Sequence, residues 1–146
     1  MTEGAEDQYP GMTLAAEGNG PGGERWSLRT WGSPAEFFRL VEIDYPDGSR
    51  DKAATSGPVP PAFGLWESSE RQVQGGILLT VWADPRVRRM RVRSKSGEQY
   101  DLAPVKDDQS VGVTLFVCLF HWSARSASIQ ALDSTGQPFS EDEIGH

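Results

Sequence analysis

The residues with the clearest chemical potential form a basic run in the middle of the chain. Six basic side chains and no acid lie between residues 86 and 95, although the protein has a formal net charge of -7: Arg86, Arg88, Arg89, Arg91, Arg93 and Lys95. Guanidinium groups make paired, charge-assisted hydrogen bonds with carboxylates and phosphates. The run therefore predicts a surface that binds an acidic protein or another polyanion.

The spacing of this run assigns three arginines to one face of a strand. Side chains alternate between the two faces of a β-strand, which rises about 3.4 Å per residue. Arg89, Arg91 and Arg93 then line up about 7 Å apart on the solvent side. Met90 and Val92 point to the opposite face.

The same charges also have a purely structural interpretation. Charged residues on an edge strand prevent edge-to-edge association of sheets, and Glu98, Asp101 or the acidic ends of the chain would neutralise them. Nucleic acid is the less favoured ligand, because a net negative charge opposes phosphate binding. An acidic protein surface is the expected partner.

Tryptophan is the second notable residue type, with five copies in 146 residues. Exposed rings would form a platform for carbohydrate or peptide ligands, whereas buried rings would fill the core. We expect most to be buried. Trp31 and Trp82 fall on the less apolar faces of their expected strands, so we predict that these two are exposed and contribute to the binding surface.

Catalytic and metal-binding patterns are weak in this sequence. Cys118 and His121 lie three residues apart, which on a strand places them on opposite faces, and Cys118 is expected to be a buried apolar side chain. Glu42 and Asp44 share one face, but hydrolysis by a carboxylate pair also requires a cleft. We expect no catalytic residue, metal site or cofactor, and a carboxylate-dependent hydrolase is the least favoured alternative.

Strand patterns recur through the middle of the chain, and no window of a dozen residues sustains a helical period. Expected strands cover residues 24–31, 36–45, 77–83, 87–94, 98–105, 111–122 and 126–132, with a weaker one near 49–55. The pattern predicts an all-β protein, an antiparallel β-sandwich that is immunoglobulin-like or similar, with about seven to nine strands.

Composition divides the chain into one domain and two acidic ends. Residues 1–23 are rich in glycine and contain no Lys or Arg, which predicts a flexible acidic tail. Residues 24–136 form the expected domain, with a long proline-rich loop at 56–76. Residues 137–146 form a second acidic tail.

One expected strand is apolar on both faces. Between Val113 and Phe120, aliphatic side chains alternate with Phe116, Cys118 and Phe120. Such a strand must be buried on both sides, so either the proline-rich loop or a partner chain must cover the second face. A partner chain gives the main alternative function, a structural subunit that assembles into homo-oligomers.

The sequence also predicts a location. Its start lacks the basic and apolar pattern of an export signal, and its longest apolar run is about half of the roughly 20 residues that a membrane helix needs. We expect a cytoplasmic protein without a membrane span. A truncated ectodomain of an envelope protein is the alternative.

The segment from Val81 to Asp133 carries a resemblance. It combines a strand, a turn at Gly97, the pattern Tyr100-x-Leu102, a long apolar strand and the pattern Ile129-x-Ala131-Leu132-Asp133. In this arrangement it resembles β-sandwich modules of uncharacterised bacterial proteins, which are often envelope-associated. The resemblance implies a sandwich and no particular activity, and no functional residue carries over from it.

Overall fold

The computed structural model of the chain describes residues 12–60, 64–74, 76–120 and 126–139, which form strands and turns without a helix. Eleven strands follow one another: β1 (Thr13–Asn19), β2 (Arg25–Gly32), β3 (Phe37–Asp44), β4 (Arg50–Gly57), β5 (Trp66–Val73), β6 (Gly76–Ala83), β7 (Arg89–Ser94), β8 (Gln99–Leu102), β9 (Lys106–Asp108), β10 (Val113–Phe120) and β11 (Ser126–Leu132). The prediction of an all-β protein is confirmed. The predicted number of strands is too low.

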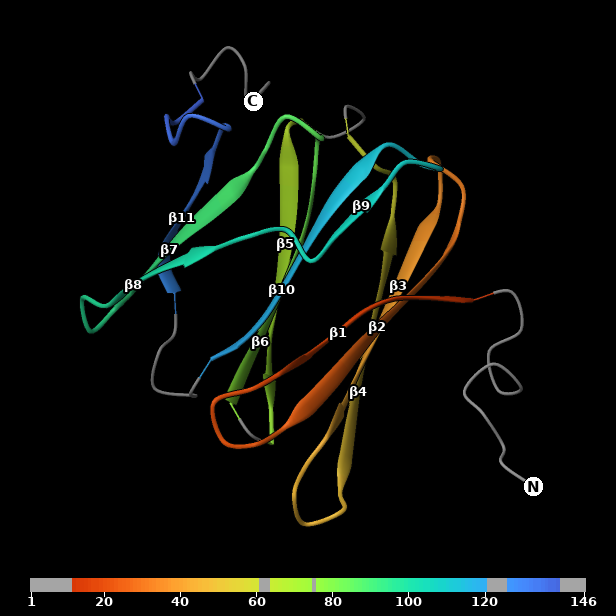
Figure 1. The fold of residues 1–146 in the computed structure, drawn as a ribbon, viewed down its shortest axis with the longest axis vertical. Coiled ribbons are helices and arrows are strands. Elements are labelled where there is room, and N and C mark those ends of the chain that lie inside the picture. Colours follow the sequence, from red (N-terminus) through yellow and green to blue (C-terminus); the bar gives the residue numbers. More distant parts are fainter. Residues whose placement is uncertain (1–11, 61–63, 75, 121–125, 140–146) are drawn as a thin grey trace.

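The strands form three antiparallel sheets, shown in Figure 1. Sheet A has the order β1-β2-β3-β4, sheet B the order β5-β6-β10-β9, and sheet C the order β11-β7-β8. Sheet B is the middle layer, because one of its faces packs on sheet A and the other on sheet C. In the described part of the chain, no helix is long and apolar enough to cross a membrane.

The layered arrangement explains the strand that is apolar on both faces. Leu115 and Val117 of β10 belong to the core shared with sheet A, whereas Phe116 and Phe120 belong to the core shared with sheet C. Every residue of the neighbouring strand β6 is buried. The expected proline-rich segment supplies only part of the cover, with Leu65 in this core and Trp66 packed against it, and sheet C of the same chain supplies the rest.

Two boundaries differ from those expected. The predicted tail at 1–23 contains β1, and the predicted loop at 56–76 contains β5. Both are edge strands whose backbone pairs with an apolar neighbour, so main-chain hydrogen bonds hold them although few of their side chains are apolar. In β1, Gly18 lies against the ring of Trp26, and a Cβ there would be 2.3 Å from Cζ2.

The core between sheets A and B contains a buried cation. Arg39 of β3 is 1% exposed, and its Cζ lies 3.3 Å from the centroid of the Trp82 ring. Its Nε donates a hydrogen bond to Thr55 Oγ1 at 3.0 Å, while Nη1 and Nη2 have no hydrogen-bond partner among the described residues. Burial lowers the pKa of Arg39 to about 10, so the side chain is still a cation at neutral pH.

We expect Arg39 and Trp82 to be energetically coupled, because the guanidinium carbon lies 3.3 Å from the centroid of the indole ring in a desolvated core. Trp82→Leu should cost less stability in an Arg39→Met background than in the wild type, with a coupling energy of about 2 kcal/mol. Urea unfolding of the two single variants and the double variant measures it.

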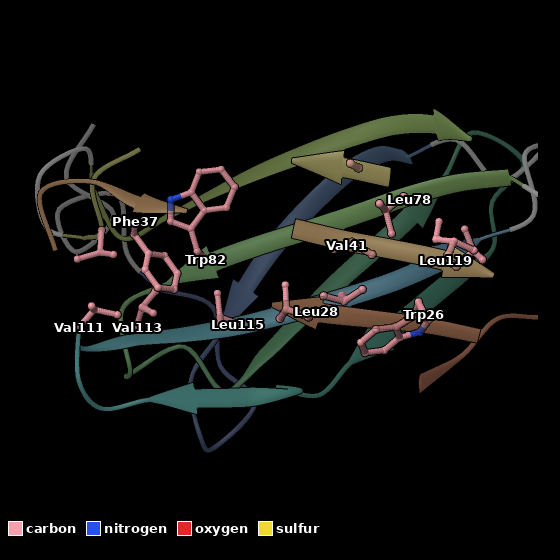
Figure 2. Packing of buried hydrophobic residues seen from close by; sticks show 14 of the residues in the cluster. Trp26, Leu28, Phe37, Val41, Leu78, Trp82, Val111, Val113, Leu115 and Leu119 are labelled. Carbon is pink, nitrogen blue, oxygen red and sulfur yellow. The ribbon is translucent and has the colours of Figure 1, made fainter. Parts of the chain in front are cut away.

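The matched control is Trp26→Leu, at the opposite end of the same core (Figure 2). Its effect should add to that of Arg39→Met within about 0.5 kcal/mol. Additivity for Trp82 as well would contradict the coupling.

Candidate binding surface

The basic run lies in sheet C, where β7 pairs with β11 on one side and β8 on the other. Met90, Val92 and Ser94 are buried against sheet B, whereas Arg89 and Arg93 are exposed on the outer side. The alternation follows the predicted register. The interpretation of these charges as protection for an edge strand is wrong, because β7 is the central strand of its sheet.

Two turns hold β7 in place. Before the strand, Asp84 Oδ1 accepts hydrogen bonds from Arg86 N and Arg86 Nε, both at 2.9 Å. After it, Ser94 N donates to Glu98 O at 2.8 Å and Gly97 N donates to Ser94 O at 3.0 Å. Gly97 has a φ of 93°, a conformation that glycine adopts at little cost. The hairpin to β8 therefore depends on this residue.

Arg88, just before β7 of sheet C, forms an ion pair with Asp107 of sheet B. Its Nη1 donates to Asp107 Oδ1 at 2.8 Å and its Nη2 donates to Oδ2 at 3.1 Å. Thr114 Oγ1 donates to the same carboxylate at 2.9 Å. The hydrogen bond between the two raises the pKa of Arg88 and lowers that of Asp107. Arg88 thus connects the start of β7 to β9 and β10 of sheet B.

The six bases of the run divide into two groups. Arg86, Arg88 and Arg91 form ion pairs with Asp84, Asp107 and Asp101 at 2.9, 2.8 and 3.2 Å respectively. The other three are exposed and make no hydrogen bond or ion pair with the described part of the chain: Arg89, Arg93 and Lys95. We call the outer side of sheet C that carries Arg89, Arg91, Arg93 and Lys95 the basic face.

A partly apolar hollow lies at the β11 edge of sheet C, where Arg93 of the basic face meets side chains that pack on the core between sheets B and C. Its volume is about 440 Å³, and its lining includes Arg93, Trp66, Ile129 and Phe139. Both aromatic residues are half-buried. The sequence interpretation missed this feature, because Trp66 and Phe139 are far apart in the chain and meet only where β11 passes near β5.

Neither predicted tryptophan belongs to this surface. Trp82 is 4% exposed, because β6 is covered on both faces and therefore has no outer side. Trp31 is half-buried in sheet A, where its ring stacks on Phe38 at 4.6 Å between centroids. Sheet A lies on the other side of sheet B from the basic face. The prediction that Trp82 is exposed is wrong, and Trp31 is remote from the arginines.

The carboxylate pair of the hydrolase alternative is part of an ion-pair cluster. Glu42 is only 5% exposed, and its oxygens lie 3.2 to 3.9 Å from nitrogens of Arg29, Arg50 and Lys52. Arg50 also contacts Asp44 at 2.6 Å. A shallow hollow of about 730 Å³ includes both carboxylates. The cluster connects β2, β3 and β4, which gives these acids a structural role.

Cys118 is half-buried at the edge of the core between sheets B and C. Desolvation raises the pKa of its thiol to about 11, from the 9.0 of an unperturbed group. His121 lies outside the described residues. Within the described ranges, no three His, Cys, Asp or Glu side chains are grouped as metal ligands.

We expect the folded protein to resist thiol alkylation. At pH 9 about half of the thiol is ionised in the unfolded chain and about 1% in the folded one, so ionisation alone predicts a reaction roughly fifty times slower. Iodoacetamide labelling with and without urea, followed by mass spectrometry, measures the ratio. Equal rates would show that Cys118 is not protected by burial.

Comparisons of the chain with protein-family models, with curated proteins and with solved structures find no match. The candidate surface therefore rests on its geometry and charge alone.

Proposed function

We propose that this protein is a non-enzymatic β-sandwich module with a third sheet, and that its basic face binds an acidic protein segment. The observation that carries the proposal is a row of exposed bases on the outer side of sheet C. Arg89 and Arg93 on the central strand β7, and Lys95 in the turn that follows it, make no hydrogen bond or ion pair with the described residues. Folded proteins seldom need such a row for stability, because exposed charges contribute little to it.

The apolar hollow favours a protein over a phosphate backbone. Binding energy at protein interfaces comes mainly from apolar anchors in pockets, while surrounding charges set specificity and association rate. A hollow lined by Trp66, Ile129 and Phe139 beside Arg93 suits an aliphatic or aromatic side chain next to a carboxylate. In an extended segment, alternate side chains repeat at about 7 Å, which matches the spacing of the arginines.

The distribution of charge removes an objection to an anionic partner. Residues 1–11 and 140–146 each contain three acids and no Lys or Arg, so they account for six of the seven net negative charges. Residues 12–139 contain 15 acids and 14 bases. Residues 12–139 are therefore nearly neutral, and the charges of this range do not set up a strongly negative field around the basic face.

The homo-oligomer alternative loses the apolar strand as a contact between copies. The strand Val113–Phe120 is buried between two sheets of its own chain, so it cannot supply an apolar interface to a second copy. The binding-module proposal is therefore the one we retain.

Removing the three unpaired bases should abolish most of the binding. We expect the variant Arg89→Ser/Arg93→Ser/Lys95→Ser to bind poly-L-glutamate about tenfold more weakly, taking about 0.5 kcal/mol for each exposed charge. The affinity of the wild type should fall as salt is raised, because the contacts are exposed. Fluorescence anisotropy with a labelled polymer measures both effects.

The matched control carries the same charge change elsewhere. Arg25, Arg71 and Lys106 are exposed, lie outside sheet C and make no hydrogen bond or ion pair with the described residues. Replacing all three by Ser should change the affinity by less than about twofold. Equal losses in the two variants would reject the basic face, and preference for heparin over poly-L-glutamate would reject an acidic protein as the partner class.

A further inference from the structure

The described chain ends beside the basic face. After β11, Asp133 N donates to Gln137 O at 2.9 Å and Gly136 N donates to Asp133 O at 3.0 Å, and Leu132 forms a β-bridge with Pro138. These contacts fix Phe139 in the lining of the hollow that Arg93 also lines.

The residues that follow have the composition that this surface fits. Residues 140–146 read Ser-Glu-Asp-Glu-Ile-Gly-His, three consecutive acids followed by an isoleucine. The acids complement three unpaired bases, and the isoleucine is the kind of side chain that the hollow accepts. Seven extended residues reach about 23 Å, whereas the row from Arg89 to Arg93 spans about 14 Å. The segment is long enough to cover the row.

The other acidic end is attached elsewhere. Residues 1–11 also contain three acids, Glu3, Glu6 and Asp7, but they lead into β1 of sheet A. Sheet B separates that layer from the basic face. The two ends therefore carry equal charge but are attached to different layers of the structure, one to β1 of sheet A and the other after β11 of sheet C.

We propose that the C-terminal segment 140–146 binds the basic face of its own molecule and competes with the acidic partner. This inference rests on the proposed function and narrows the class of partner. The partner contains consecutive acids followed by an aliphatic residue, and it must displace the similar sequence at residues 141–144 of this chain. Attachment at Phe139 gives the segment an effective concentration in the millimolar range, which compensates for weak and solvent-screened contacts.

The test uses full-length variants with identical changes at the two ends. Glu141→Gln/Asp142→Asn/Glu143→Gln should strengthen binding of poly-L-glutamate roughly three- to tenfold, as expected if the segment occupies the face for about 70 to 90% of the time. Glu3→Gln/Glu6→Gln/Asp7→Asn removes two Glu and one Asp in the same way and should change the affinity less than about twofold. The difference should shrink as salt is raised. Equal effects would mean that only net charge matters, and would overturn the inference.

A second measurement does not depend on any partner. Backbone amide chemical shifts of residues 141–144 should differ between the wild type and the variant Arg89→Ser/Arg93→Ser/Lys95→Ser, and should not respond to Arg25→Ser/Arg71→Ser/Lys106→Ser. Unchanged shifts would overturn the inference even if poly-L-glutamate binds. If no form of the protein binds poly-L-glutamate but the shifts change as expected, the segment contacts the face while the proposed function fails.

Discussion

The structure depends on burying both faces of sheet B. Its two inner strands, β6 and β10, carry apolar side chains on both faces. A strand of this kind is stable only where both faces are removed from water. A single facing sheet would leave Phe116 and Phe120 exposed. Sheets A and C are therefore both required, and each is free to use its outer side for other purposes because its inner side already packs against sheet B.

This constraint also determines where charge is tolerated. Arg39 lies on the inner side of sheet A, and its guanidinium is acceptable there because the ring of Trp82 supplies a negative π face in place of water. On the outer side of sheet A, Glu42 gathers three cations and connects three strands. On the outer side of sheet C only some of the charges are paired, because Asp101 forms an ion pair with Arg91 but not with Arg89 or Arg93. The two outer sides differ in whether their charges are satisfied internally, and that difference is the reason for proposing sheet C as the binding side.

Charge is divided along the chain as well as across the layers. Residues 12–139 are nearly neutral, and the acids of residues 1–11 and 140–146 supply almost all of the net charge. For the proposed anionic partner, the charges close to the basic face therefore matter more than the net charge of the protein, and among the described residues these include Asp84, Asp101 and Asp107. Because such contacts are exposed, ionic strength is the variable that governs them most directly.

The sequence by itself determined the all-β class and the two-residue alternation of β7, because side-chain direction on a strand follows from local backbone geometry. It also identified Val113–Phe120 as a strand buried on both faces. It did not show what covers that strand, because a period-two pattern carries no information on which distant segment packs against it. Trp82 illustrates the same limit. In the sequence it falls on the less apolar face of its strand, yet both faces of β6 are buried. Likewise, the hollow formed by Trp66, Ile129 and Phe139, and the pairing of Arg88 with Asp107, join residues far apart in the chain, and only the packing of the three sheets brings them together.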